Sequence, residues 1–305
     1  MNKIRVAVIG VGHLGSIHAK IYKEIENCSL VAVCDTDKNH LNQVSSTLNI
    51  PGYANYEELF DKVDAVSVAV PTKLHYKIAN DFLKHNIHAL VEKPFTPNLE
   101  EADALIKLAQ ENKLILQVGH IERFNSAFAA TQKIIKNPKF IECHRLSPFP
   151  NRSLDVGAVL DIMIHDIDII LGLVNSEIKQ IESVGINVLT KFEDIANSRI
   201  TFKNGCVANL TASRISDEIM RKIRIFQENT YISLDYKDAK AVVYKKGTFT
   251  ITKQDLPIEK EQPLQKELES FIDCVRNHKE PLVSGPVARE ALRVALEIQN
   301  QIWHK

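Results

Sequence analysis

The first third of the chain alternates short apolar runs with longer segments of helical spacing. We predict strands at 4–9, 30–34, 65–70, 89–91 and 114–118, and helices near 14–26, 37–48, 73–86 and 98–112. The strand-like runs are apolar throughout, as at 6–9, so both faces of each strand should be buried. This pattern is typical of a mostly parallel sheet with helices on both sides, a doubly wound α/β domain.

The pattern changes after about residue 120. Helix-like segments at 128–136 and 154–173 precede strand-like segments at 178–189, 196–202, 207–213, 222–226, 231–235 and 241–244. Asn204-Gly205 is the signal of a tight hairpin, so this second sheet should be open and mostly antiparallel. Helices at 264–277 and 286–303 close the chain. We therefore predict two domains, 1–120 and 121–305, and expect the helix 286–303 to pack back on the first.

Composition and charge narrow the function classes. Of 305 residues, 45% are hydrophobic and 25% charged, and 38 basic side chains balance 38 acidic ones. Without a basic run, nucleic acid and anionic membranes are poor partners, and a small-molecule substrate is expected. No apolar run is long enough to span a bilayer. The lack of such a run, with an N-terminus that runs directly into a strand instead of a signal-peptide segment, predicts a cytoplasmic protein. The five cysteines are widely spaced and form no C-x-x-C pair, which argues against a disulfide framework or a metal site.

A glycine-rich motif follows the first strand directly. Gly10-Val11-Gly12-His13-Leu14-Gly15 precedes a helix, the context in which this spacing binds a dinucleotide pyrophosphate. Asp35 closes the second strand, where a carboxylate can bond the ribose 2′-hydroxyl and repel a 2′-phosphate, so NAD is favoured over NADP. The alternative is a plain strand-to-helix turn with Asp35 capping the next helix, although Asp37 is better placed as that cap.

Further motifs occur in order along the chain. Val70-Pro71-Thr72 with His75, Glu92-Lys93-Pro94, Gly119-His120 and the run from Asp161 through His165 to Asp168 resemble those of the Gfo/Idh/MocA oxidoreductases. The resemblance implies a Rossmann domain followed by an α/β domain with an open sheet that binds a sugar or polyol. It implies catalytic roles for Lys93, Asp161 and His165. It also implies cofactor contacts from the glycine-rich loop, Asp35, Pro71, Thr72, His75, Glu92, Lys93 and Pro94.

Alcohol oxidation with NAD explains these residue types chemically. A base must accept the hydroxyl proton while hydride leaves carbon, and the imidazole of His165 suits that task. Asp161 lies four residues earlier, so on a helix it shares a face with His165 and can orient the ring. Lys93 would stabilise the developing alkoxide. The alternatives are a core histidine and a solvated lysine, and the Lys93–Pro94 peptide could be cis or trans.

The residues after the first domain suggest the substrate. The run 119–125 and the Asp161 segment look most like those of family members that oxidise C3 of UDP-N-acetylglucosamine on the route to 3-amino sugars. Besides the three catalytic candidates, we expect substrate contacts from His120, Arg123, Asn125 and Arg145. A diphosphate needs cations, and Arg152 and Arg214 lie in the same region. The alternative for each arginine is an ordinary surface charge. Only Gly157 remains of the family's usual glycine pair before this segment.

Two other interpretations stay open. One is a dehydrogenase of UDP-N-acetylglucosaminuronate, a free sugar or inositol, and the other is a sensor that binds NAD without turnover. A sensor would not need Lys93, Asp161 and His165 together. One face of the second sheet needs covering, so we also expect a homodimer or homotetramer.

Overall fold

The computed structural model describes residues 3–149, 156–259 and 261–304. The chain forms two compact units. The first contains residues 1–120 and 264–289, and the second contains 121–263 and 290–305. Residues 264–289 thus belong with the first unit, although they follow the boundary at residue 120 by a long stretch of chain.

The first unit is built on a six-stranded parallel sheet. Its strands are β1 (Ile4–Ile9), β2 (Cys28–Cys34), β3 (Gly52–Tyr53), β4 (Ala65–Val68), β5 (His88–Glu92) and β6 (Leu116–Gly119). Their order is β3-β2-β1-β4-β5-β6. The strands β2 and β3 therefore lie on one side of β1, and β4, β5 and β6 lie on the other. The predicted parallel sheet is confirmed, with β3 as a short additional edge strand.

Helices connect these strands in two groups. They are α1 (His13–Glu24), α2 (Lys38–Leu48), α3 (His75–Lys84) and α4 (Leu99–Glu111), with α7 (Pro263–Asn277) added from later in the chain. Right-handed crossovers put α1 and α2 on one face of the sheet and α3 and α4 on the other. Apolar residues of α1, α7 and the strands form one buried cluster. The order in which strands are added to the sheet reverses between β1 and β4, which is where open α/β sheets bind ligands.

The second unit contains an eight-stranded sheet in the order β14-β13-β12-β11-β7-β10-β9-β8. The strands are β7 (Pro138–Leu146), β8 (Ile178–Ile186), β9 (Ile195–Phe202), β10 (Val207–Ser213), β11 (Met220–Gln227), β12 (Thr230–Asp235), β13 (Lys240–Lys246) and β14 (Ile251–Asp255). Only β7 and β10 pair in parallel among these neighbours, so the sheet is mostly antiparallel as predicted. The β9–β10 hairpin turns at the predicted Asn204-Gly205.

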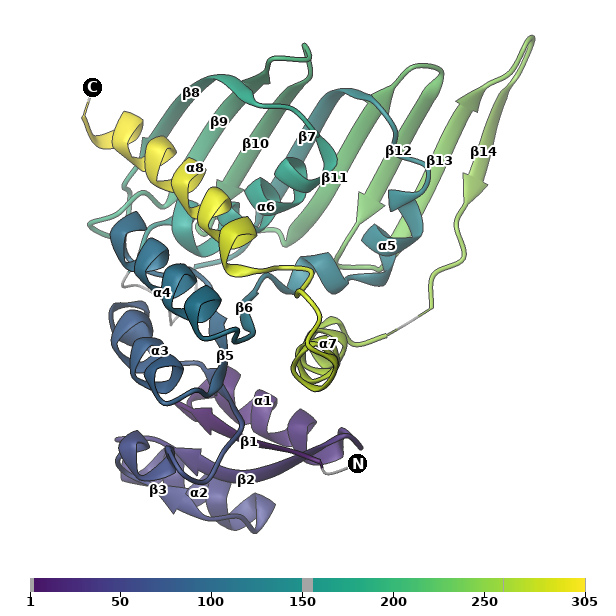
Figure 1. The fold of residues 1–305 in the computed structure, drawn as a ribbon. Helices are drawn as coiled ribbons and strands as arrows, with labels where there is room; N and C mark the ends of the chain where they lie inside the picture. Colours follow the sequence, from purple (N-terminus) through teal and green to yellow (C-terminus); the bar gives the residue numbers. More distant parts are fainter. Residues whose placement is uncertain (1–2, 150–155, 260, 305) are drawn as a thin grey trace. The chain divides into compact units, whose positions relative to one another are not determined.

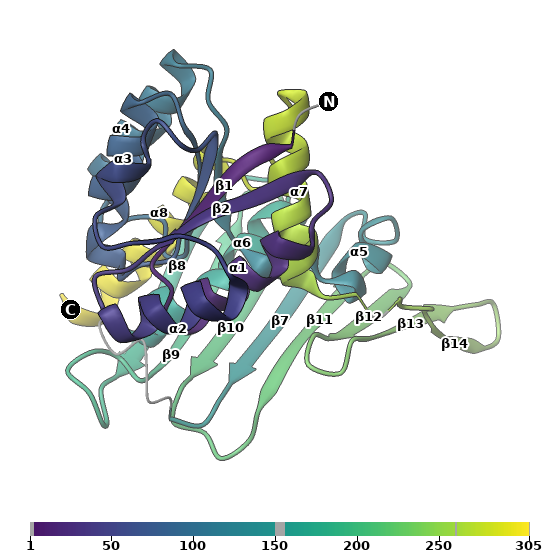
Figure 2. The same ribbon diagram turned by 90° about the horizontal axis from the view of Figure 1, so that it is seen from below.

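Helices cover one face of this sheet. They include α5 (Ser126–Gln132), α6 (Ile164–Leu173) with a π-helical turn before it (Val159–Met163), and the later part of α8 (Gly285–Trp303). Figures 1 and 2 show α5 and α6 on the same face, where α6 packs on β7 and β10 and α5 on β12 and β13. Buried Ile141 and Cys143 point to this face from β7, as strand alternation requires.

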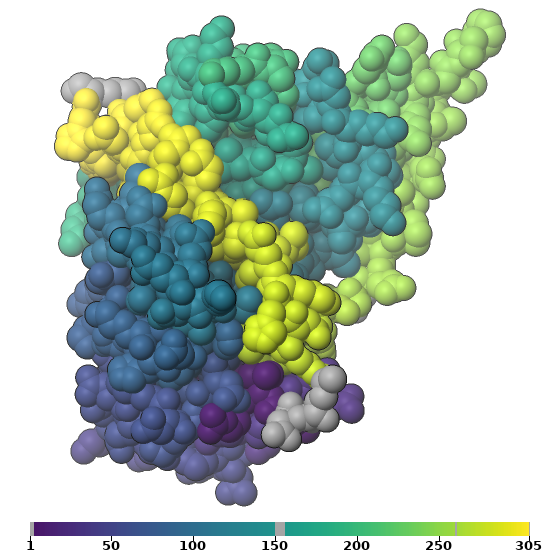
Figure 3. Space-filling view, viewed as in Figure 1, coloured from purple at the N-terminus to yellow at the C-terminus, as the bar shows by residue number. Residues whose placement is uncertain are grey.

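The other face of the sheet carries no helix among the described residues. Phe140, Phe226, Tyr231 and Tyr244 stand in register on β7, β11, β12 and β13, and neighbouring rings stack at centroid distances of 5.7, 4.8 and 5.2 Å. At the edge, the turn between β13 and β14 projects from the surface in Figure 3 and carries Phe249, which is 96% exposed.

Two strands of the second unit escaped the sequence pattern. The central strand β7 contains Glu142, His144 and Arg145, so its alternation is hidden by charged side chains. The edge strand β14 is exposed at every position and has no apolar face to detect. The predicted helix at 128–136 is α5, which begins and ends earlier. No described helix is long and apolar enough to cross a membrane.

Candidate active site

The glycine-rich loop has the geometry needed to bind a pyrophosphate. Gly10 has φ of 83°, and a Cβ there would lie 2.6 Å from the carbonyl oxygen of Ala69. A Cβ on Gly15 would lie 1.8 Å from the carbonyl oxygen of Gly10, so only glycine lets α1 start this close to the turn. Above Gly12 there is open space within 4 Å. The loop therefore has the tight turn and the accessible backbone that a dinucleotide requires.

Asp35 holds this loop in place. One carboxylate oxygen accepts the Val11 N–H at 2.7 Å, and the other accepts the Asp37 N–H at 2.8 Å. The cap of α2 is Asp37, whose side chain accepts the N–H groups of Asn39 and His40. The alternative in which Asp35 caps the helix is therefore wrong. Asp35 lies at the end of β2 beside the glycine-rich loop, where the predicted ribose contact would be made.

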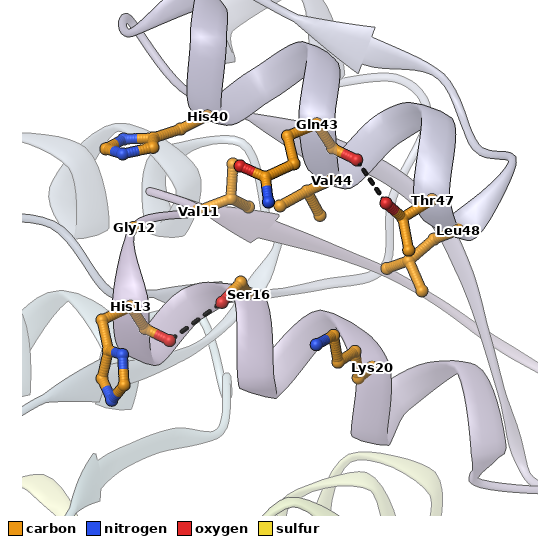
Figure 4. Close-up of a pocket in the computed structure, with 10 residues that line it drawn as sticks. All are labelled: Val11, Gly12, His13, Ser16, Lys20, His40, Gln43, Val44, Thr47 and Leu48. Carbon is orange, nitrogen blue, oxygen red and sulfur yellow. Dashed lines mark hydrogen bonds between the residues drawn. The ribbon is translucent and has the colours of Figure 1, made fainter.

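A groove opens between α1 and α2 next to this loop (Figure 4). It has a volume of about 300 Å³ and is lined by Val11, Gly12, His13, Ser16, Lys20, His40, Gln43, Val44, Thr47 and Leu48. Val11, Val44 and Leu48 form an apolar floor, while His13 and Lys20 are exposed. Leu14 is half-buried and does not line the groove.

The segment after β4 lies beside the glycine-rich loop. Pro71 precedes a short 3-10 helix (Thr72–Leu74), and His75 begins α3. The His75 ring lies 2.9 Å from the Val70 carbonyl oxygen and 3.0 Å from that of Pro94, and its pKa is lowered by burial. His75 thus links two loops at the carboxyl end of the sheet, which supports a framework role near the cofactor.

Lys93 follows β5 and is half-buried, and the Lys93–Pro94 peptide is cis. The preceding Glu92 is 7% exposed, and its Oε2 accepts the Lys93 N–H at 3.2 Å. Its Oε1 lies 3.2 Å from Nε2 of His18, whose Nδ1 lies 2.7 Å from Ser67 Oγ. Both carboxylate oxygens of Glu92 therefore have partners inside the first unit. A direct contact between Glu92 and the cofactor remains a prediction.

Asp161 and His165 lie on the helix of the second unit that was predicted to carry them. Asp161 belongs to the π-helical turn, in which the Ile164 N–H bonds the Val159 carbonyl, and His165 follows in α6. Both side chains are partly exposed, whereas Met163 is buried. The interpretation of His165 as a core histidine is therefore not supported. Single π turns occur frequently at functional sites.

Glu193 holds the start of this helix. Its buried carboxylate accepts the Val159 N–H at 3.1 Å, and Gln299 and Trp303 of α8 donate to it at 2.9 and 3.1 Å. A Cβ on Gly157 would lie 2.0 Å from Glu193 Oε1. The single glycine retained before the Asp161 segment is thus the one that leaves room for this carboxylate.

Arg145 lies inside the second unit and is 5% exposed. Its guanidinium donates to Asp166 at 2.8 Å and to Glu122 at 2.7 Å, with the Tyr236 ring 5.8 Å away. Burial raises the pKa of Asp166, and the attraction of Arg145 opposes that rise only in part. These contacts give Arg145 a framework role and leave its predicted substrate contact without support from its surroundings.

The other arginines are also paired. Arg123 donates to Asp168 at 2.7 Å, and the fully buried Arg214 donates to Asp194 at 2.9 Å. The interpretation of these side chains as ordinary surface charges is therefore wrong for Arg123 and Arg214. Arg152 lies outside the described residues.

Two further substrate candidates are buried. His120 is buried at the end of β6, in the first unit. Asn125 caps α5 by accepting the Ala127 N–H at 3.0 Å, and it donates to Glu122 at 3.2 Å. The structure thus places Lys93 and His120 in the first unit and Arg123, Asn125, Arg145, Asp161 and His165 in the second.

The sequence pattern did not single out His18 or Glu193 as part of the site. A histidine on the inward face of the first helix and a glutamate in a loop carry no spacing signal. Their partners lie 74 and 110 residues away, in Glu92 and Trp303. Only the fold brings these groups together.

A parallel sheet with a glycine-rich loop and an acidic residue at its switch point, followed by an open antiparallel sheet, defines a dinucleotide-dependent oxidoreductase. Residues 4–120 match the oxidoreductase family with NAD-binding Rossmann fold, and residues 119–233 match the GFO/IDH/MocA C-terminal domain. The chain belongs to the Gfo/Idh/MocA oxidoreductases, and its cofactor is NAD.

Individual relatives match over almost the full length. The UDP-N-acetylglucosamine 3-dehydrogenase of Acidithiobacillus ferrooxidans is 36% identical, with 98% of this chain and 97% of that protein covered. A solved structure of that enzyme superposes with a TM-score of 0.94 over 99% of this chain and 98% of that one. The scyllo-inositol 2-dehydrogenase of Bacillus subtilis is 28% identical, with 98% of this chain and 94% of that protein covered.

Proposed function

We propose that this protein oxidises the C3 hydroxyl of UDP-N-acetylglucosamine to a ketone with NAD, producing a precursor of 3-amino sugars. The observation that carries the proposal is the 36% identity to a UDP-N-acetylglucosamine 3-dehydrogenase over nearly the whole of both chains. The second unit supports it with a partly exposed carboxylate and imidazole on one helix.

His165 is the proposed base. In the reaction the C3–H bond breaks, its electron pair leaves as hydride, and the hydroxyl proton passes to the imidazole of His165 as the C=O bond forms. Bound NAD supplies the hydride acceptor. Asp161, one helical turn earlier, stabilises the protonated ring, and the Lys93 ammonium stabilises charge on the substrate oxygen.

The residues proposed to hold the cofactor fit a dinucleotide. Gly10, Gly12 and Gly15 provide the close backbone approach, with His13 and Leu14 as the first residues of α1. Asp35 is placed to bond the adenosine ribose. Pro71 and Thr72 follow β4 beside this loop, and Gly10 would touch Val70 if it carried a Cβ. His75 and Glu92 act behind these loops, through the contacts described above.

Turnover with defined alcohols tests the proposal. NAD is incubated with UDP-N-acetylglucosamine, UDP-N-acetylglucosaminuronate, free N-acetylglucosamine and inositol, and NADH absorbance is followed. We expect oxidation of UDP-N-acetylglucosamine, with the 3-keto product identified by NMR. Turnover of inositol or free sugars alone would contradict the proposed substrate, and a lack of NADH with every alcohol would favour the sensor.

A variant pair tests the base. His165→Ala should bind NAD normally and lose about 10²-fold or more in kcat. His144→Ala, a histidine on the uncovered face of the same unit, serves as the matched control and should keep kcat. Unchanged turnover by His165→Ala would remove this residue from the mechanism.

We also propose that a second copy of the chain covers the uncovered face of the second sheet. Support comes from the stacked row of Phe140, Phe226, Tyr231 and Tyr244 and from Arg224 and Glu142, 3.4 Å apart on that face. Tyr231→Lys should lower the mass measured by light scattering, whereas Phe249→Lys should not. A wild-type monomer at assay concentration would refute the proposal.

The reaction is proposed to take place in the cytoplasm. All five cysteines are buried thiols without a disulfide, as suits a reducing compartment. A reporter fusion found outside the cytoplasm would contradict this assignment.

A further inference from the structure

A polar chain crosses the apolar interior of the first unit. His18 is fully buried on α1, and its ring joins Ser67 of β4 on one side and Glu92 of β5 on the other. Apart from Ser67 and Glu92, the buried positions of β1, β4 and β5 carry only valine, alanine, leucine or isoleucine. A buried carboxylate is unfavourable unless it is paired, so the Glu92 carboxylate needs partners inside the unit.

The Glu92 carboxylate is shared between His18 and Lys93. Oε1 faces His18 Nε2 at 3.2 Å, and Oε2 accepts the Lys93 backbone N–H at 3.2 Å. Burial alone would raise the pKa of Glu92, but His18 and the positive charge of Lys93 outweigh it, so that the pKa lies below its usual range. Glu92 is therefore ionised at neutral pH, directly beside Lys93.

The space for this carboxylate is provided by β6. A Cβ on Gly119 would lie 2.8 Å from Glu92 Oε2. Because β6 has Gly119 directly opposite Glu92, the carboxylate has room to contact both His18 and the Lys93 N–H. The arrangement is thus formed by four elements, α1, β4, β5 and β6.

We propose that Glu92 and His18 are positioning residues that hold Lys93 where its ammonium can stabilise charge on the substrate oxygen. This inference rests on the proposed role of Lys93 in the reaction. Glu92 fixes the backbone of Lys93 and attracts its ammonium, and His18 fixes the carboxylate. Because α1 begins at the glycine-rich loop, the same histidine connects the helix that receives the pyrophosphate with the residue that acts on the substrate.

Variants of His18 separate positioning from packing. An asparagine side chain reproduces the position of Nδ1 and keeps the Ser67 contact, whereas a glutamine side chain reproduces Nε2 and keeps the Glu92 contact. We expect His18→Asn to lose about tenfold or more in kcat with UDP-N-acetylglucosamine and NAD, because small misplacements of reacting groups are costly. His18→Gln should keep most of kcat. The KM for UDP-N-acetylglucosamine and the Kd for NAD should change by less than about twofold in both variants, because His18 is fully buried and has no proposed contact with either molecule.

Glu92→Gln and Glu92→Asp form the second pair. The glutamine variant removes the charge and should lose kcat like His18→Asn, and the aspartate variant should recover part of it. If His18→Asn and Glu92→Gln fold and turn over like the wild type, or if the two His18 variants behave alike, the inference is overturned. If Glu92→Gln does not fold, the two His18 variants decide.

The proposed function fails in a different way. Lys93→Ala should abolish turnover while NAD still binds. Full activity of Lys93→Ala would contradict the proposed role of Lys93 itself, whereas an inactive Lys93→Ala with a fully active His18→Asn would contradict only the positioning role.

Discussion

Replacing Arg145 by methionine should destabilise the second unit strongly. The substitution keeps an unbranched apolar chain but leaves Glu122 and Asp166 buried next to each other without their cation. Removing one partner of a buried ion pair costs about 3–5 kcal/mol. The second unit has 159 residues, and for that size each kcal/mol of lost stability lowers Tm by about 2–4 °C. We therefore expect a fall of about 6–20 °C at pH 7.

The pKa of Asp166 determines how the destabilisation by Arg145→Met changes with pH. The pKa of Asp166 in the folded protein is already raised by burial, so between its unfolded value of about 3.9 and the folded value the folded state binds more protons. An acid in this position makes the protein less stable as pH rises through that window. Without Arg145 the pKa of Asp166 rises further, so the difference in Tm between wild type and variant should shrink as pH falls from 7 to 5.

Thermal unfolding followed by circular dichroism at pH 7 and pH 5 measures both effects. Lys203→Met is the matched control, because Lys203 forms an ion pair with Glu177 in the same unit and its side chain is 63% exposed. Such an exposed pair contributes less than about 1 kcal/mol. A shift of the Arg145 variant as small as that of the control, or a difference that grows at pH 5, would refute the reasoning.

Three further results are expected. Gly157→Ala should lower the free energy of unfolding by about 1–3 kcal/mol in urea titrations, because the added Cβ would lie 2.0 Å from Glu193 Oε1; equal losses with and without a Glu193→Ala background would disprove that clash. Hydrogen bonds from the backbone N–H groups of Leu189 and Thr190 outweigh burial and hold the pKa of Asp194 below its usual range, so the stability advantage over Asp194→Asn should be constant near neutral pH and shrink as pH falls below the unfolded value of about 3.9. Asp35→Ser should lower kcat/KM with NAD and raise it with NADP, and an unaltered preference for NAD would rule out the ribose contact.

The first unit could be predicted closely from the sequence because its signals are local. The strand at 4–9 has the predicted bounds, and the predicted helices differ from α1, α2, α3 and α4 by no more than a few residues at each end. Continuous apolar runs report burial on both faces, and the glycine spacing reports a turn whose shape depends only on the backbone. The edge strand β3 has two residues and leaves no pattern to recognise.

The second unit was harder because its interior is partly ionic. Arg145 breaks the apolar alternation of β7, and the partners that make its burial tolerable, Glu122 and Asp166, lie 23 and 21 residues away. For the same reason the arginines were expected to face a diphosphate, when Arg145 and Arg214 are almost fully buried against carboxylates. The positions of charged residues in a sequence do not distinguish a side chain that binds a ligand from one that is paired with a carboxylate inside the fold.

The contact between Trp303 and Glu193 provides an intrinsic fluorescence probe of the second unit. Trp303 is the only tryptophan of the chain and is 42% exposed, and its indole N–H donates to Glu193, the carboxylate that holds the start of the Asp161 helix. Intrinsic tryptophan emission therefore has a single origin, in the last turn of α8. A shift of that emission on adding a sugar nucleotide would report a change around Trp303 and Glu193, at the C-terminal end of α8. The measurement needs neither a label nor turnover.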